Sequence, residues 1–151
     1  TSSGIILASD PDLATIISNA KKEVDTLIVS FHWGVEYETV HNARQEEIAK
    51  RAIDAGADLI VGHHPHVAQD LSEYKGVPII YSLGNFIFDQ NWSDETRRSF
   101  AAQITFTGTK VTGVQLMPAY IENWVQPRFL APSEALYKQI LSDVAAHSWW
   151  Q

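Results

Sequence analysis

The stretch Asp58-Leu59-Ile60-Val61-Gly62-His63-His64-Pro65-His66 places three histidines directly after a short apolar run. A run of this kind is typical of a strand that is buried on both faces of a parallel sheet. Ligands of open α/β sheets bind at the edge formed by the carboxyl ends of the strands. The stretch therefore predicts a strand that carries imidazole side chains to the functional edge of an α/β sheet.

A second apolar run, Thr26-Leu27-Ile28-Val29-Ser30-Phe31, ends in the same way, in His32-Trp33-Gly34-Val35-Glu36. Residues 43–55 lie between the two runs and have helical spacing, and Gly56 provides the helix end. Strand, helix and strand in this order form a βαβ unit, in which both strands run in the same direction. We therefore expect His32 and the cluster at 63–66 at one edge of the sheet, as a candidate metal site.

The remaining sequence predicts further helices and strands of an α/β fold. They are a helix over residues 11–24, a strand over 77–83, a β-hairpin of residues 100–106 and 110–117, and a closing amphipathic helix over 133–147. The direction of the strand at 77–83 stays open, because its link to the preceding strand is near the minimum for a parallel crossover. Residues 90–98 are expected to be a loop, and residues 123–132 to be irregular.

Length and charge limit the possible functions. The 151 residues are enough for one domain with a core and too few to expect two. The net charge of −7 argues against a nucleic-acid-binding surface, which needs clustered Lys and Arg. No apolar run approaches the roughly 18 residues of a membrane-spanning helix. The start, Thr1-Ser2-Ser3 followed at once by an apolar run, indicates a domain entered partway through, with an upstream segment missing.

The absence of cysteine restricts any metal to His, carboxylate and amide ligands. His64-Pro65-His66 is the strongest candidate, because two imidazoles one residue apart can face one metal centre or two adjacent ones, and the alternative is a histidine-rich surface loop. His63 is either a donor to a ligand, a substrate contact or a solvent-facing residue. His32 alone is more often a structural group, but its place at the same edge makes it a candidate ligand.

Two further polar residues are candidates for the site. Glu36 could orient a ligating histidine, act as an acid or base, or bind a substrate cation; alternatively it caps the loop or pairs with Arg44. Asn85 follows the strand at 77–83, where it either contacts a metal-bound ligand or holds a loop.

Other histidines and aromatic residues are given structural or solvent-facing roles. His41 and His147 are expected to be solvated. The aromatic residues Phe86, Phe88 and Trp92 are expected to pack in the core or a loop and not to form a stacking platform.

Four segments, in this order, resemble the CapA family of bacterial capsule synthesis proteins, which act in poly-γ-glutamate biosynthesis and belong to the calcineurin-like metallophosphoesterase superfamily. They are Ser30-Phe31-His32-Trp33-Gly34-Val35-Glu36-Tyr37, Ala55-Gly56-Ala57-Asp58-Leu59-Ile60-Val61-Gly62, His63-His64-Pro65-His66-Val67-Ala68-Gln69 and Tyr81-Ser82-Leu83-Gly84-Asn85-Phe86-Ile87-Phe88-Asp89. The resemblance implies part of a four-layer α/β/β/α sandwich with a two-metal centre, in which His32, His64 and His66 are ligands. The implied cofactors are divalent Mn, Fe or Zn ions.

The resemblance covers the C-terminal half of such a domain. The N-terminal half of the superfamily supplies further Asp and Asn ligands, whereas Asp10 and Asp12 here begin a helix. Residues 1–151 are thus either a single domain or the C-terminal portion of one, and the second metal would be completed by residues absent from this chain. The implied partners are the missing N-terminal half and either poly-γ-glutamate synthase subunits or an anionic polymer. The implied location is extracellular or at the cell surface, through an upstream membrane anchor.

Three hypotheses follow for function. The leading hypothesis is a metal-dependent phosphoesterase-like hydrolase of capsule synthesis, with Glu36 and Asn85 beside the ligands or facing the substrate. The alternative is a non-catalytic accessory subunit that binds polymer or synthase partners. A third interpretation is a truncated fragment, which would expose an apolar sheet face.

Overall fold

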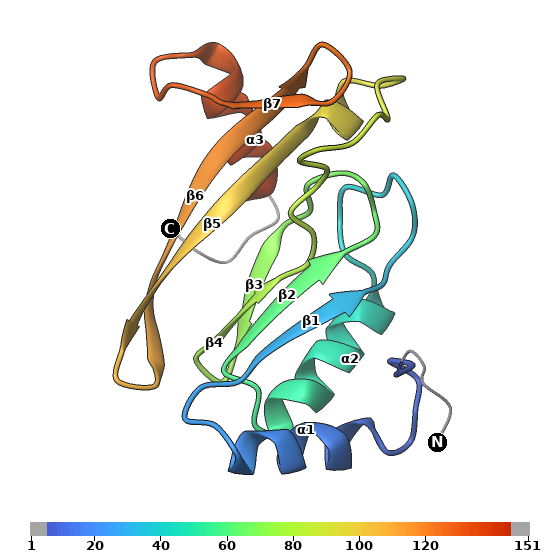
Figure 1. Cartoon of the computed structure of the whole chain (residues 1–151), viewed down its shortest axis with the longest axis vertical. Coiled ribbons are helices and arrows are strands. Elements are labelled where there is room, and N and C mark those ends of the chain that lie inside the picture. The colour runs from blue at the N-terminus through green and yellow to red at the C-terminus, as the bar shows by residue number, and fades with distance from the viewer. Residues whose placement is uncertain (1–5, 146–151) are drawn as a thin grey trace.

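The computed structural model describes residues 6–145 and arranges them in two sheets and three α-helices (Figure 1). The first sheet has the strand order β1-β2-β4-β3, formed by β1 (Ile28–His32), β2 (Leu59–His63), β4 (Val77–Ile80) and β3 (Leu71–Tyr74). The second sheet has the order β5-β6-β7, formed by β5 (Arg98–Thr107), β6 (Lys110–Glu122) and β7 (Gln126–Phe129). The helices are α1 (Leu13–Lys22), α2 (Ala43–Asp54) and α3 (Ala135–Ala145), and a short 3-10 helix, η1 (Glu95–Arg97), precedes β5. The predicted α/β fold is confirmed, and the four-layer sandwich stays an expectation.

The predicted βαβ unit forms the centre of the first sheet. Strands β1 and β2 are parallel, and their register pairs His32 with His63 at the carboxyl ends. Helix α2 connects them and begins at a capping box: the Asn42 side chain accepts from the backbone of Gln45, and the Gln45 side chain accepts from that of Asn42. Both histidine-bearing segments consequently leave the sheet at the same edge, as predicted.

The direction of the third predicted strand is now clear. β4 is parallel to β2 and ends at Ile80, three residues before the expected end. The segment between them contains β3, a strand that the sequence analysis missed, which is antiparallel to β4 and joined to it by Lys75 and Gly76. Both turn residues have positive φ angles, 52° and 80°, which explains the glycine in this tight connection.

Two apolar cores lie on opposite faces of the first sheet. On one face, α1 and α2 pack through Leu13, Ile17, Ala49 and Ala52 against sheet residues such as Ile60. On the other face, Leu71 and Ile80 cluster with Phe100 of β5 and Val144 of α3. The second sheet and α3 therefore cover the face that the first two helices leave open. Strand β7 lies within the segment expected to be irregular, and α3 covers most of the closing helix, of which residues 146 and 147 lie outside the described part.

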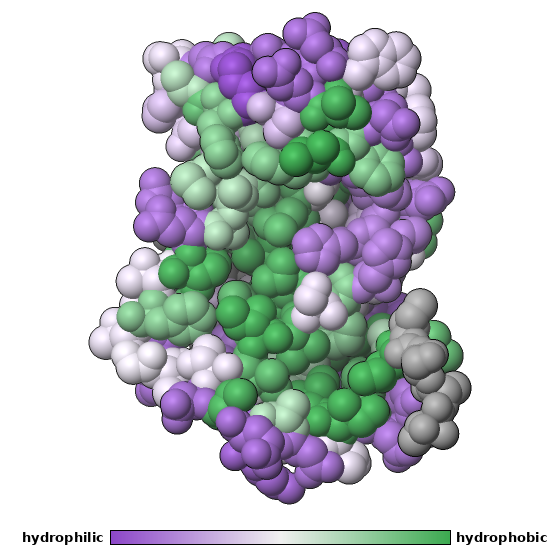
Figure 2. Space-filling model, in the orientation of Figure 1, coloured by the Kyte–Doolittle hydropathy of each residue, from purple (hydrophilic) through white to green (hydrophobic). Residues whose placement is uncertain are grey.

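The β1 side of the molecule is apolar at its surface. Figure 2 shows hydrophobic residues gathered over the first sheet, where β1 and β2 lie in Figure 1, and hydrophilic residues at the lower edge along α1. β1 ends the strand order of its sheet, and Ile28 on it remains 51% exposed. A groove of about 400 Å³ runs between α1 and β1, with Leu13, Ile16 and His32 in its lining. Within residues 6–145, no helix is long and apolar enough to cross a membrane.

Candidate metal centre

The turn after β2 is held in an unusual backbone conformation. His64 and His66 have positive φ angles of 105° and 62°, which non-glycine residues rarely adopt. The carbonyl of Pro65 between them accepts a hydrogen bond from the backbone N–H of Tyr37 at 2.8 Å, and the carbonyl of His63 accepts one from Trp33 at 3.0 Å. The loop after β1 and the turn after β2 are therefore joined through their backbones. Backbone strain of this kind persists where surrounding contacts impose it, and it is common at functional sites.

This junction brings three possible metal ligands together. One ligand atom from each of Glu36, His64 and His66 lies within 4.8 Å of the others. The carboxylate comes from the loop after β1, and both imidazoles come from the turn after β2. Two imidazoles and a carboxylate are a donor set that suits Zn, Mn or Fe, so the residues present fit the implied metals.

His32 lies against this group without being one of the three. Its ring centroid is 4.5 Å from that of His64, and the two rings are tilted by 48°. The structure thus brings His32 to the edge where the βαβ unit predicts it. Its assignment as a ligand stays a prediction.

The surroundings of His63 and His64 favour the neutral form of these two imidazoles. Burial lowers the pKa of His64 below its usual value, and His32 and His66 lower it further, against the opposing effect of the Glu36 carboxylate. The pKa of His63 is also lowered, chiefly by desolvation of its ring and then by His32. Because the neutral form of imidazole is the one that binds metals, His64 is ready to act as a ligand at neutral pH.

Asn85 contacts the candidate ligand His66 directly. Its Oδ1 lies 2.9 Å from Nδ1 of His66, and the residue is only 6% exposed. The Nδ2 group donates to the backbone carbonyl of Thr96 at 3.1 Å and to Oε1 of Gln90 at 3.2 Å. Asn85 therefore has the position of a residue that orients a ligating histidine, and it also holds its own loop, so both roles considered for it from the sequence are compatible with the geometry.

A close contact explains the glycine that precedes the histidines. A Cβ atom on Gly62 would lie 1.9 Å from the carbonyl oxygen of Tyr81 and 2.4 Å from Nε1 of Trp33. That indole nitrogen donates to the same carbonyl at 2.9 Å. Trp33 thus crosses β2 directly above Gly62, and only glycine leaves room for it.

One expectation about a neighbouring residue needs correction. His41 was expected to be solvated, but its ring stacks on Tyr81 with 3.8 Å between centroids and lies 2.8 Å from the buried Asp70. Trp92 is 64% exposed and meets the ring of Tyr37 edge-on from its loop, so of the two alternatives expected for it, the structure shows loop packing. The prediction for His147 lies outside the described residues.

The other aromatic residues border the site. Phe88 lies 5.0 Å from His66 between ring centroids, and Tyr37 lies 6.3 Å from the same ring. Phe86 packs on Phe129 of β7. Arg44, the alternative partner considered for Glu36, pairs with Glu47 at 2.8 Å. The Glu36 side chain lies beside His64 and His66, and among the ion pairs of the described residues Arg44 pairs with Glu47 and not with Glu36.

The sequence is similar to known proteins over most of its length. Residues 3–90 match the family described as bacterial capsule synthesis protein PGA_cap. The PGA biosynthesis protein CapA of Bacillus subtilis (strain 168) is 50% identical over 99 residues, which cover 65% of this chain and 26% of the relative. The capsule biosynthesis protein CapA of Bacillus anthracis is 38% identical over 152 aligned positions, which cover 95% of this chain and 36% of the relative. The chain therefore spans about a quarter to a third of the length of these relatives.

Proposed function

The chain belongs to the bacterial capsule synthesis protein family PGA_cap, and we propose that it supplies part of a metal-dependent, phosphoesterase-like hydrolase site in a capsule synthesis protein. The observation that supports this most directly is the convergence of Glu36, His64 and His66 within 4.8 Å. These side chains come from two loops at the carboxyl edge of a parallel sheet, where ligand sites of α/β folds lie. The names of the CapA relatives support the role in capsule biosynthesis.

In the proposal, the three side chains hold a divalent Mn, Fe or Zn ion, and His32 contributes from β1 either to the same ion or to a second one completed by residues outside this chain. A bound metal supplies an acidified water and compensates negative charge on a phosphoryl oxygen. The protein residues would provide the orientation: Asn85 accepts from Nδ1 of His66 and so leaves Nε2 as the nitrogen available to a metal. The lowered pKa of His64 keeps its ring neutral and able to bind.

The site requires partners in this proposal. The apolar groove between α1 and β1, and the exposed side chain of Ile28, support association of the N-terminal half of the domain with this edge. Further proposed partners are poly-γ-glutamate synthase subunits or an anionic polymer. The proposed location is outside the cell or at its surface, through an upstream anchor.

A non-catalytic accessory subunit is the second candidate. It is favoured by the exposed rings of Tyr37 and Trp92 beside the possible ligands, because aromatic surfaces next to a cation site suit binding of a polymer chain as well as its cleavage. In this alternative the same three side chains hold a cation that bridges to the polymer.

Metal content separates these proposals from a purely structural role. We expect the purified chain to retain about one equivalent of Mn, Fe or Zn by elemental analysis, and His64→Ala and His66→Ala to lose it. His63→Ala is the matched control, because His63 ends β2 directly before this turn and lies outside the three-residue group. Intact metal content in both alanine variants would contradict the ligand assignment.

Turnover then separates the hydrolase from the accessory subunit. The metal-loaded full-length protein is incubated with a generic phosphodiester such as bis(p-nitrophenyl) phosphate. Hydrolysis that disappears with His64→Ala supports the enzyme. A fully metal-loaded protein without turnover favours the accessory role.

A further inference from the structure

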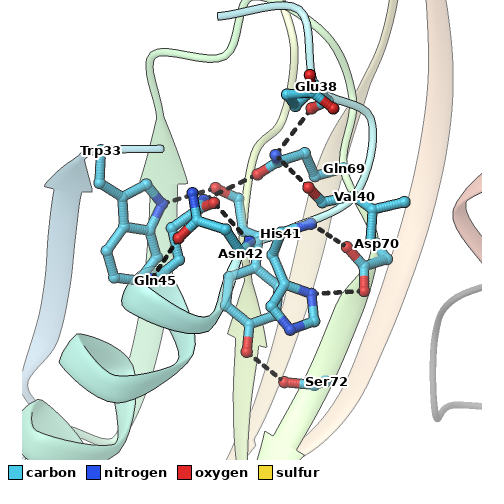
Figure 3. Close-up of polar contacts among 10 residues, drawn as sticks. Trp33, Glu38, Val40, His41, Asn42, Gln45, Gln69, Asp70 and Ser72 are labelled. Carbon is cyan, nitrogen blue, oxygen red and sulfur yellow. Dashed lines mark hydrogen bonds and ion pairs between the residues drawn. The ribbon is translucent and has the colours of Figure 1, made fainter. Parts of the chain in front are cut away.

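The loop that carries Glu36 is fixed at its far end by buried polar side chains. It runs from Trp33 after β1 to Asn42 at the start of α2. Figure 3 shows Gln69 and Asp70 directed at this loop, with contacts to Glu38, Val40 and His41. Gln69 follows His66 by three residues. The short segment 64–70 therefore carries two possible metal ligands, His64 and His66, and also the side chains that contact the loop of the third, Glu36.

Gln69 is the first of these anchors. It is 1% exposed, and its Nε2 group donates to the carbonyls of Glu38 at 2.8 Å and Val40 at 3.2 Å. Its Oε1 accepts from Nε2 of the equally buried Gln45 on α2 at 2.9 Å. Both amide hydrogens and the carbonyl oxygen thus have partners. The Gln69 side chain thus donates to two backbone carbonyls of the loop, as the N–H groups of a neighbouring β-strand would.

Asp70 is the second anchor. It is also 1% exposed, and its two oxygens contact the backbone N–H of His41 at 3.1 Å and Nδ1 of the same residue at 2.8 Å. The His41 ring lies flat on Tyr81, with an angle of 6° between the rings. Tyr81 is fully buried, and its hydroxyl contacts Ser72 of β3 at 2.9 Å. These contacts therefore fix the end of the loop at His41 against the first sheet.

These contacts enclose Glu36 between two fixed points. Before Glu36 in the chain, Trp33 is hydrogen-bonded to His63, and directly after it, Tyr37 is hydrogen-bonded to Pro65. Further along the loop, Glu38, Val40 and His41 are hydrogen-bonded to Gln69 and Asp70. Buried polar groups are unfavourable unless they are fully hydrogen-bonded. The buried side chains of Gln69 and Asp70 meet this requirement largely through hydrogen bonds to the loop that carries Glu36.

We infer that Gln69 and Asp70 are positioning residues for the metal centre, which set the place of Glu36 relative to His64 and His66. This inference rests on the proposed function and adds residues that touch no metal ligand directly. It predicts that loss of the Gln69 contacts weakens metal binding through Glu36 and not through general loss of stability.

A double-mutant cycle tests this route. Gln69→Met keeps the length of the side chain and removes its hydrogen bonds, and Glu36→Gln removes the proposed carboxylate ligand. Binding of Mn²⁺ or Zn²⁺ to the chain is measured by titration calorimetry. We expect about tenfold weaker binding for Gln69→Met, and no further loss when it is added to Glu36→Gln. If the two losses multiply, Gln69 does not act through Glu36 and the inference is wrong.

A matched control variant shows how far a loss of overall stability by itself weakens metal binding. Ile121→Val deletes a methylene in β6, at a fully buried residue of the other sheet. It is expected to lower the free energy of unfolding and to leave metal affinity unchanged. If Ile121→Val weakens metal binding as much as Gln69→Met does, the effect is one of stability and the inference falls.

Hydrogen exchange provides a readout that needs no metal. In Gln69→Met we expect the amides of Tyr37 and Glu38 to exchange at least about tenfold faster, with the β2 amides unchanged. Unchanged exchange in the loop, or an equal rise throughout β2, overturns the positioning role. If the unmodified chain binds no metal, the proposed function fails by itself, and the exchange experiment still decides whether Gln69 fixes this loop.

Discussion

Nδ1 of His66 lies 2.9 Å from Oδ1 of Asn85, and this contact determines which nitrogen of His66 is available to a metal. The Asn85 amide is oriented by the backbone carbonyl of Thr96, which can only accept, so the Nδ2 group points there and Oδ1 points to the histidine. His66 must therefore carry its proton on Nδ1. Its Nε2 atom is left as an acceptor, which is the form that coordinates a metal.

Removal of this contact should weaken metal binding. For Asn85→Ala we expect about 10-fold to 100-fold lower affinity for Mn²⁺ or Zn²⁺ in titration calorimetry, because the His66 ring loses its fixed orientation. Asn85→Asp keeps an oxygen that accepts from Nδ1 but sets its other oxygen against the carbonyl of Thr96, so it should retain more affinity than Asn85→Ala and also lower the free energy of unfolding. Equal affinities in the alanine variant and the unmodified chain would show that Asn85 serves only its own loop.

The contact above Gly62 predicts a large cost for a single methyl group. Gly62→Ala should lower the free energy of unfolding by about 3 kcal/mol or more, because the new Cβ meets the Tyr81 backbone and the Trp33 indole in a fully packed region. Gly113→Ala is the comparison in β6, where a Cβ would lie 3.5 Å from Thr105, an ordinary contact. That variant should change stability by no more than about 0.5 kcal/mol. Urea unfolding of both proteins decides, and equal effects would contradict the packing argument.

The elements that the sequence predicts well are those with strong apolar patterns. The runs that end at His32 and His63, and the helix between them, are visible because both runs are largely apolar, although only β2 is mostly buried and β1 lies at the edge of its sheet. Strands β3 and β7 were missed for the opposite reason. Leu71–Tyr74 has two adjacent polar residues at its centre and shows no apolar run or alternation. Gln126–Phe129 is mostly polar, contains Pro127 and lies at a sheet edge. The direction of β4 could not be decided without β3, since the antiparallel strand accounts for the length of the crossover.

The residues of the candidate site likewise fall into those whose positions the sequence predicts and those whose positions it does not. The shared edge of His32, His64 and His66 follows from the βαβ topology alone. The place of Glu36 does not, because the shape of its loop depends on Gln69 and Asp70, roughly thirty positions along the chain. His41 shows the same limit. Its neighbours Val40 and Asn42 form no pattern that indicates burial, and only the fold reveals that Tyr81 and Asp70 contact its ring.

The buried phenol of Tyr81 predicts a loss of stability at high pH. Burial raises the pKa of Tyr81 to about 12 from its ordinary value of 10.0, the hydrogen bond with Ser72 opposes the shift, and the carboxylates of Glu46 and Asp70 add to it. Because the pKa is higher in the folded state, the unfolded chain loses this proton first as the pH rises. The stabilisation is complete below about pH 10 and is lost between about pH 10 and 12, with an upper limit of roughly 2.7 kcal/mol.

Guanidinium unfolding between pH 8 and pH 12 measures this dependence. Tyr81→Phe should be less stable than the unmodified chain at pH 8, by about 1 kcal/mol for the lost hydrogen bond with Ser72, and should lose less stability above pH 10 because it has no phenol at this position. Ser72→Ala is the matched control, since it removes the same hydrogen bond and keeps the phenol, so it should retain the steep loss above pH 10. If the profiles of Tyr81→Phe and Ser72→Ala run parallel up to pH 12, the buried phenol does not govern the alkaline limit of the fold.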